Sequence, residues 1–213
     1  TSFAFVALAA AVSARAQTTF EAPVSISRST LGRFVAAPIS ADLDGNGVPD
    51  LVSIGGLVDE DPGLLVARGL GVRVFTPALR VSLSGSVPAR PAAAELDGDG
   101  DDDLAGGFTA GRLVLLLSDG GGFVEVSGPV RAGEFGGFAL GDADLDGDLD
   151  LYFLENDSGW TFRVAELEGG AFTGVVTGDV QISSSALLPP AFELIDFDGD
   201  GRADVYSLGS VAL

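Results

Sequence analysis

The sequence predicts an all-β protein, a β-propeller of about four blades, and three observations support this prediction. A nine-residue loop rich in Asp and Gly occurs four times, with starts separated by 53, 47 and 54 residues, and a repeat of this length is typical of propellers. A short apolar stretch follows each loop, as a strand would. No segment has the capped, 3.6-residue periodicity of a helix. About four short strands in each repeat match the composition of a propeller blade.

The four loops obey one rule. Acidic or amide side chains stand at loop positions 1, 3, 5 and 9, and glycine stands at position 6. The stretches after the loops (DLVSIGG, DLAGGF, DLYFLE and DVYSLG) are apolar, so each loop is expected to open a strand. The loops are DLDGNGVPD (Asp42 to Asp50), ELDGDGDDD (Glu95 to Asp103), DADLDGDLD (Asp142 to Asp150) and DFDGDGRAD (Asp196 to Asp204), with Gly47, Gly100, Gly147 and Gly201 at position 6.

The acidic charge of the chain argues against binding to polyanions, and its distribution indicates a binding site. The chain has 31 acidic residues against 11 basic ones, all arginine, and a formal net charge of -20. Such a field repels nucleic acid and anionic lipid, because both are polyanions. However, 18 of the 31 carboxylates lie within the four loops. This clustering indicates a site rather than an evenly solvated surface.

The residue types that the chain lacks exclude several chemistries. It has no His, Cys or Met, so the usual ligands of zinc, copper and iron are missing, and no Ser/His/Asp or Cys/His set can form. The Gly-rich stretches carry no phosphate-binding fingerprint. An acid/base pair of carboxylates remains open by residue type, but most clustered carboxylates are expected to hold metal. We therefore expect no enzyme.

The loop pattern suits calcium. Ca²⁺ takes about 6–8 oxygen ligands, and alternate side chains of a curled loop can point at one centre, with glycine at position 6 permitting the sharp turn. The position-7 carbonyl and the position-9 carboxylate would complete the shell, giving about four ions in all. The expected ligands are Asp42, Asp44, Asn46, the Val48 carbonyl and Asp50; Glu95, Asp97, Asp99, the Asp101 carbonyl and Asp103; Asp142, Asp144, Asp146, the Asp148 carbonyl and Asp150; and Asp196, Asp198, Asp200, the Arg202 carbonyl and Asp204.

Two alternatives to these calcium loops are less suitable. An EF-hand needs a bidentate Glu at position 12 and flanking helices, but position 12 holds Ser53, Gly106, Phe153 and Ser207. Magnesium demands near-octahedral geometry and keeps its waters. Calcium remains the expected ion.

The N-terminal stretch has two interpretations. Residues 3–12 (FAFVALAAAV) followed by SARAQ are similar to a signal peptide cleaved after Ala16. Alternatively, residues 1–26 are apolar strands of the fold, and residues 27–213 are the four-repeat propeller. Either interpretation, with an acidic and cysteine-free chain, favours a secreted, extracellular or cell-surface protein.

The loops and their flanks resemble the FG-GAP/VCBS repeat family, the calcium-bearing blades of integrin-type and bacterial secreted β-propellers. The resemblance rests on AAPISADLDGNGVPDLVSIGG and GGFALGDADLDGDLDLYFL and covers most of residues 30–213. Such propellers commonly have seven or eight blades, and four are found here. Because the fourth repeat is two strands short, we expect residues 1–26 to complete the last blade. They could do so within one molecule or in a neighbouring one, which would build a fibre by strand donation.

Three functions follow from these expectations. The first is a structural or adhesive surface module, or a fibre-forming one. The second is a carbohydrate-binding, lectin-like propeller with Trp160 as a sugar-stacking platform, although strand packing is the favoured interpretation of Trp160, Tyr152 and Tyr206. The third is an accessory domain of a secreted enzyme. The sequence does not identify the protein or glycan ligand.

Overall fold

The described part of the chain is all-β. The computed structural model describes residues 31–34, 38–57, 63–72, 74–81, 91–108, 111–120, 122–131, 133–182 and 192–207, and these contain strands, turns and loops but no helix. No helix there is long and apolar enough to cross a membrane. Residues 1–26, which are predicted to form strands or a signal peptide, lie outside these ranges.

The first sheet is antiparallel and follows the order β1-β3-β4-β7, with β2 also paired to β3. Strands β1 and β2 pair with opposite ends of β3, so together they occupy the position of one interrupted first strand. A small hairpin of β5 and β6 follows β4. The bounds are β1 Leu31–Phe34, β2 Ile39–Ala41, β3 Asp50–Leu57, β4 Gly63–Ala67, β5 Gly69–Gly71, β6 Val74–Phe75 and β7 Leu79–Arg80.

The second and third sheets are four-stranded antiparallel meanders, in which each strand pairs with the next along the chain, and the fourth is a two-stranded hairpin. The second sheet comprises β8 (Ala92–Ala94), β9 (Asp103–Phe108), β10 (Arg112–Ser118) and β11 (Phe123–Val130). The third comprises β12 (Glu134–Gly141), β13 (Asp150–Asn156), β14 (Trp160–Glu168) and β15 (Ala171–Ile182). The fourth comprises β16 (Phe192–Ile195) and β17 (Asp204–Ser207).

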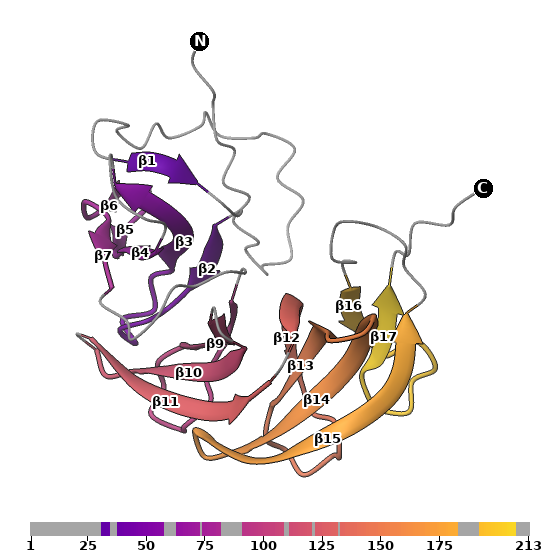
Figure 1. Ribbon diagram of the computed structural model, residues 1–213. Helices are drawn as coiled ribbons and strands as arrows, with labels where there is room; N and C mark the ends of the chain where they lie inside the picture. Colours follow the sequence, from indigo (N-terminus) through magenta and orange to yellow (C-terminus); the bar gives the residue numbers. More distant parts are fainter. Residues whose placement is uncertain are drawn as a thin grey trace, which may run out of the picture.

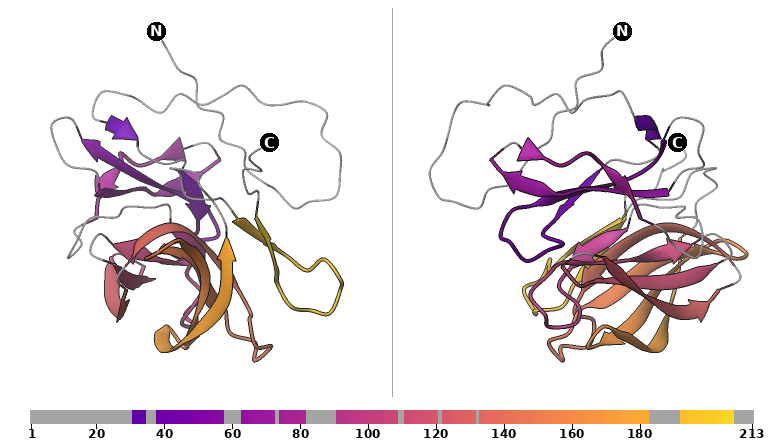
Figure 2. Two further views of the ribbon diagram at one scale, coloured as in Figure 1. Left: turned by 45° about the vertical axis from the view of Figure 1, so that its right-hand side comes forward. Right: turned by 90° about the vertical axis from the view of Figure 1, so that its left-hand side faces the viewer.

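The four sheets follow one another in chain order along an arc (Figure 1). The first strands of consecutive sheets lie next to each other in space: β2 contacts β8, β8 contacts β12 and β12 contacts β16. In the right-hand view of Figure 2 the β2–β3 loop and the β16–β17 loop lie on the same side of the molecule. The arrangement thus brings the first strands together and carries the Asp-rich loops at their ends.

The core is divided into three apolar clusters, each between two consecutive sheets. The first joins β3 and β4 to β9 and β10, with Ile54 and Leu116 among its members. The second joins the second and third sheets through residues such as Leu115 and Phe153. The third packs Phe162 edge-on against Phe192, with ring centroids 5.3 Å apart. The second and third sheets therefore bury apolar side chains against both the preceding and the following sheet.

A buried ion group links the second sheet to the third. Glu155 on β13 is 2% exposed and lies 2.8 Å from Nη2 of Arg131, which follows β11, and 2.5 Å from Nε of Arg163 on β14. Burial opposes ionisation of Glu155, but the hydrogen bond and charge of Arg131 and the charge of Arg163 outweigh it, so the pKa of Glu155 is lowered. The carboxylate is thus held charged inside the protein.

Candidate metal centres

Each Asp-rich loop connects the first and second strands of a sheet. The position-9 aspartates Asp50, Asp103, Asp150 and Asp204 are the first residues of β3, β9, β13 and β17. The prediction that each loop opens a strand is therefore confirmed. The four loops occupy equivalent places in the four sheets.

The position-1 carboxylate curls each loop around itself. One of its oxygens accepts the backbone N–H of the position-6 glycine in all four loops, and the other accepts from position 4 or 5. The position-6 bonds are Gly47 N to Asp42 Oδ2 (2.7 Å), Gly100 N to Glu95 Oε2, Gly147 N to Asp142 Oδ2 (3.1 Å) and Gly201 N to Asp196 Oδ2 (3.1 Å). The first carboxylate is therefore aimed into the loop.

Positions 3 and 5 turn inward by the same type of contact. Each is an Asp or Asn whose side-chain oxygen can accept the N–H two residues later. The position-5 bonds are Val48 N to Asn46 Oδ1 (2.7 Å), Asp101 N to Asp99 Oδ1 (2.9 Å), Asp148 N to Asp146 Oδ1 (2.9 Å) and Arg202 N to Asp200 Oδ1 (2.8 Å). Asp97, Asp144 and Asp198 at position 3 accept from position 5 at 3.2, 3.2 and 3.1 Å.

These contacts gather carboxylates into groups whose oxygens lie within 4.8 Å of one another. The first loop has two acidic residues and the amide of Asn46 at the same positions. Among the predicted ligands, the groups leave out Asp103, Asp150 and Asp200, and none of the groups lies in the first loop, where Asp42, Asp44 and Asp50 were predicted. They are Glu95 with Asp97 and Asp99, Asp142 with Asp144 and Asp146, and Asp196 with Asp198 and Asp204.

The donor set fits a hard divalent cation. All side-chain donors are carboxylate or amide oxygens, which calcium prefers. In the first loop, Oδ1 of Asp44 is buried and has no hydrogen-bond partner, although the position-3 Oδ1 of the other loops accepts an N–H. A buried carboxylate oxygen without a partner is costly. Its position within the loop suits a metal ligand.

The position-9 aspartates have a second task that the sequence did not predict. Asp50 and Asp103 are 0% exposed and Asp150 is 3% exposed. Their Oδ1 atoms accept N–H groups from residues in or just after the third strand of the same sheet, and their Oδ2 atoms accept the position-2 N–H of the loop. The donors to Oδ1 are Gly69 (2.6 Å), Ser118 (2.7 Å) and Leu167 (3.0 Å), and those to Oδ2 are Leu43 (3.1 Å), Leu96 (2.9 Å) and Ala143 (2.9 Å).

Burial affects the titration of Asp103 and Asp150. Desolvation raises the pKa of Asp103 to about 6, against the lowering effect of its two backbone hydrogen bonds, and raises the pKa of Asp150 for the same reason. Asp50 instead pairs with Arg68 at 2.9 Å. At position 1 burial is outweighed by backbone N–H groups, which lower the pKa of Glu95. In the metal-free second loop, Glu95 is therefore held charged, and the raised pKa leaves Asp103 partly protonated near pH 6.

The raised pKa of Asp103 predicts a pH dependence in metal-free protein. Between its ordinary value of 3.8 and about 6 the folded state binds more protons than the unfolded state, so the free energy of unfolding falls as pH rises through this window, by on the order of 2 kcal/mol. Because other carboxylates titrate in the same range, the measurement is urea unfolding at pH 4 and 7 of wild type and Asp103→Asn in identical buffers. We expect the variant to show a weaker fall, and equal falls would contradict the assignment.

Two residues of each loop adopt the left-handed backbone conformation. Position 6 was expected to need it, and its glycines have φ between 76° and 101°. Position 4 needs it as well: Gly45, Gly98 and Gly199 have φ of 61°, 86° and 77°, and Leu145 has φ of 68°. Leu145 is the one non-glycine with positive φ among the described residues. The third loop is therefore strained at a position where the others are relaxed.

Leu145→Gly is expected to stabilise the protein. It removes a left-handed strain of about 1–2 kcal/mol, offset by the greater entropy of glycine in the unfolded chain, about 0.5–1 kcal/mol. Leu145 is exposed, so little buried area is lost. Leu145→Ala is the matched control, since it trims the side chain but keeps Cβ. In chemical unfolding the glycine variant should be more stable than the alanine variant, and the reverse order would show that the φ carries no strain.

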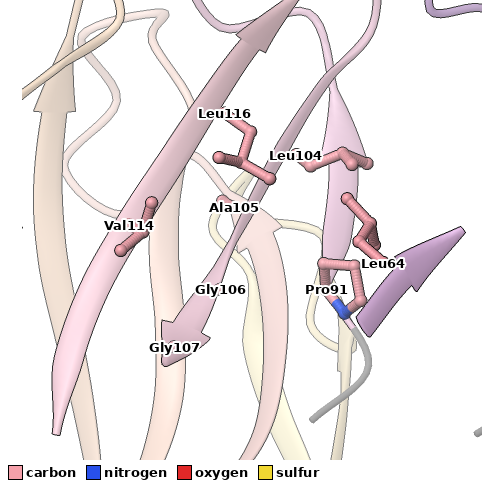
Figure 3. A pocket seen from close by; sticks show the side chains of 8 residues that line it. All are labelled: Leu64, Pro91, Leu104, Ala105, Gly106, Gly107, Val114 and Leu116. Atoms are coloured by element: carbon pink, nitrogen blue, oxygen red, sulfur yellow. The ribbon is translucent and has the colours of Figure 1, made fainter. Parts of the chain in front are cut away.

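Two hollows among the described residues do not offer an alternative catalytic site. A cavity of about 10 Å³ between the first two sheets is lined by apolar groups, with the side chains of Leu64, Leu104 and Leu116 around Pro91 (Figure 3), and is too small and apolar for a ligand. A more open hollow of about 260 Å³ lies beside Ile39, Ala92 and Phe138, where β2, β8 and β12 meet. Its lining contains no titratable side chain, which leaves the loops as the candidate site.

The aromatic side chains of the third sheet lie in the core, whereas two on the fourth hairpin are exposed. Trp160 is 7% exposed and belongs to the third core cluster together with Tyr152. The interpretation of Trp160 as a sugar-stacking platform is therefore wrong, because its ring is not available at the surface. Phe197 and Tyr206 on the fourth hairpin are exposed, with ring centroids 6.1 Å apart.

The function of this protein has to be interpreted from its loops, because two comparisons with known proteins give no match. A scan against models of known protein families gives no match to this chain, and a search of curated proteins gives none either.

Proposed function

We propose that this protein is an extracellular calcium-binding β-repeat protein whose loops hold one Ca²⁺ apiece, with blades of the FG-GAP/VCBS type. One observation carries the proposal. Four loops far apart in sequence share one internal pattern, in which position 1 accepts from the position-6 glycine and position 5 accepts from position 7. Unrelated acidic turns would not share the same hydrogen bonds at the same loop positions.

Electrostatics favour a bound cation. Two unit charges 4 Å apart repel by about 4 kcal/mol at the effective dielectric of a protein surface, and three carboxylates in one loop approach one another within about this distance. A divalent cation removes the repulsion and accepts the same oxygens as ligands. The all-oxygen set and the flexible ligand count favour Ca²⁺ over Mg²⁺ and over transition metals.

The arrangement of sheets supports a propeller-like architecture. Consecutive antiparallel sheets pack face to face, and their first strands are neighbours. Both features are expected of blades set around an axis. We propose that the four sheets are such blades, and that closure of the ring needs strands beyond the described ones.

The fourth hairpin marks where such strands would add. Among the described residues β17 pairs only with β16, and Val205 and Tyr206 are 39% and 45% exposed, whereas their equivalents Leu151 and Tyr152 in the third sheet are 0% and 5% exposed. We propose that residues 1–26 supply the missing strands, in the same molecule or in a neighbour. The second arrangement would make the protein a fibre subunit.

A structural or adhesive role outside the cell fits these features best. The chain is strongly acidic and lacks cysteine, and calcium-stapled modules are suited to extracellular calcium levels. The feature that favoured a lectin was an exposed Trp160, and that residue is buried. A stable display surface is therefore proposed ahead of carbohydrate binding.

The test is calorimetric titration of metal-free protein with Ca²⁺. We expect about four sites, weak or absent binding of Mg²⁺, and a larger loss of affinity in Asp146→Ala than in Asn46→Ala, because the first removes a charged ligand and the second a neutral one. Fewer than about three sites would overturn the four-site proposal. Equal losses in the two variants would show that ligand charge does not determine affinity here.

A further inference from the structure

In the second and fourth loops, the residue at position 8 lies beside the start of the preceding loop. In the fourth loop this residue is Ala203, whose Cβ would lie 3.4 Å from a Cβ added at Gly141, next to the first residue of the third loop. The surroundings are apolar, because Ala203 and Ala143 both pack against the third core cluster. Position 8 is Pro49 in the first loop and Leu149 in the third. Only the second loop has a charged residue there, Asp102.

Asp102 makes a two-way backbone contact with the first loop. The N–H of Asp42 donates to Asp102 Oδ2 at 2.7 Å, and the N–H of Asp102 donates to the carbonyl of Asp42 at 2.7 Å. Ser118 in the second sheet also donates its hydroxyl to the carbonyl of Leu43. A Cβ on Gly45 would overlap the carboxylate of Asp101. The first loop therefore rests directly on the second.

The residue held in this way organises the first loop. Asp42 stands at position 1, and its carboxylate accepts the N–H groups of Asn46 at 3.2 Å and Gly47 at 2.7 Å. Both backbone hydrogen-bonding groups of Asp42 are engaged by Asp102. Asp102 lies between Asp101 and Asp103, which are the predicted position-7 and position-9 ligands of the second loop. Ordering of this segment therefore fixes Asp42.

We propose that Asp102 is a positioning residue that couples the first two metal sites, so that Ca²⁺ in the second loop strengthens Ca²⁺ binding in the first. The inference rests on the proposed calcium function and adds that the four sites are not independent. Linkage requires the same factor in the reverse direction. Couplings of this kind are typically about 5–150-fold, and for a single two-way contact we expect about tenfold.

Direct repulsion between the two cations has the opposite sign. It would make the filled second loop weaken the first, and salt screens it over a Debye length of about 8 Å at 0.15 M. The hydrogen-bonded contact is short-ranged and neutral at the backbone of Asp42, so screening affects it less. Titrations at 0.15 M and 0.5 M salt therefore separate the two effects.

The experiment is a site-resolved titration of metal-free protein, followed by the amide NMR signals of the position-6 glycines. Each of these N–H groups donates to the position-1 carboxylate of its own loop, so Gly47 reports on the first loop and Gly147 on the third. The second loop is disabled by Asp97→Asn with Asp99→Asn. We expect Ca²⁺ affinity at Gly47 to fall about tenfold. Disabling the third loop by Asp144→Asn with Asp146→Asn removes the same charge and should change it less than twofold.

Variants of Asp102 test whether the contact is the cause. In Asp102→Ala the side-chain acceptor is gone, so disabling the second loop should no longer weaken the first. Asp102→Asn keeps a carbonyl acceptor and should restore the dependence, which a purely electrostatic role would not allow. Unchanged binding at Gly147 and Gly201 verifies that each variant is folded.

Two other outcomes have different meanings. If disabling the second loop leaves Gly47 unaffected, or weakens it equally in wild type and Asp102→Ala, the coupling is refuted while calcium binding stands. If none of the four glycine signals moves with Ca²⁺, the proposed function itself fails.

Discussion

Removal of Ca²⁺ is expected to lower the melting temperature by on the order of 20 °C or more. An ion that binds only the native state stabilises it by about 2.7 kcal/mol at 100 times its dissociation constant. For a chain of this size 1 kcal/mol corresponds to about 2–4 °C, so one site contributes about 5–10 °C. The carboxylate groups within 4.8 Å of one another add repulsion when the ion leaves. Calorimetric melting with excess Ca²⁺ and with excess EDTA measures the difference.

Matched conditions identify the ion. Mg²⁺ added to the metal-free protein should recover only part of the loss, because it holds its waters more tightly. A high concentration of NaCl should recover little, since screening does not replace a ligated ion. A melting temperature that is the same in EDTA and in Ca²⁺ would show that the loops fold without a cation.

Glu155→Ala is expected to destabilise the protein by about 3 kcal/mol in saturating Ca²⁺. The change leaves Arg131 and Arg163 without their common carboxylate, in side chains that are 24% and 16% exposed. Arg131 directly follows β11 of the second sheet and Glu155 lies in β13 of the third, so the contact between these two parts of the fold is also lost. Urea unfolding monitored by circular dichroism gives the free energy.

Two substitutions calibrate this result. Glu168→Ala removes an exposed carboxylate at the end of β14 and should change stability by less than about 0.5 kcal/mol. Glu155→Gln retains the volume and one acceptor, and should fall between the two. If Glu155→Ala were as mild as Glu168→Ala, the ion group would contribute nothing to holding the sheets together.

Local sequence was sufficient to predict the loops and the strands they open. The residues at positions 1 and 6 are only five apart in the chain. The hydrogen bond from the Gly47 N–H to the Asp42 carboxylate is therefore a local contact within one loop. The stretches that follow the four loops, beginning at Asp50, Asp103, Asp150 and Asp204, form β3, β9, β13 and β17. These features depend on neighbours in the chain, which a pattern records.

Features that depend on distant residues could not be predicted. Asp103 receives an N–H from Ser118, fifteen residues away, and nothing in the loop motif reveals that donor. Glu155 is buried because Arg131 and Arg163 arrive from other strands. Leu145 did carry a signal, since the other three loops have glycine at position 4. Asp102 carried one too, as the only acid at position 8, but its partner Asp42 lies sixty residues away.

The division of the core into clusters between consecutive sheets gives the protein the connectivity of a one-dimensional array. Among the described residues, each cluster joins one pair of consecutive sheets, and none joins all four. In such arrays stability is a sum of unit and nearest-neighbour terms, so damage spreads from a unit to its neighbours and then decays along the chain. Loss of one ion should therefore appear as local opening of one sheet and its contacts, with faster hydrogen exchange there first. Among the described sheets, we expect the exposed β16–β17 hairpin to open most readily.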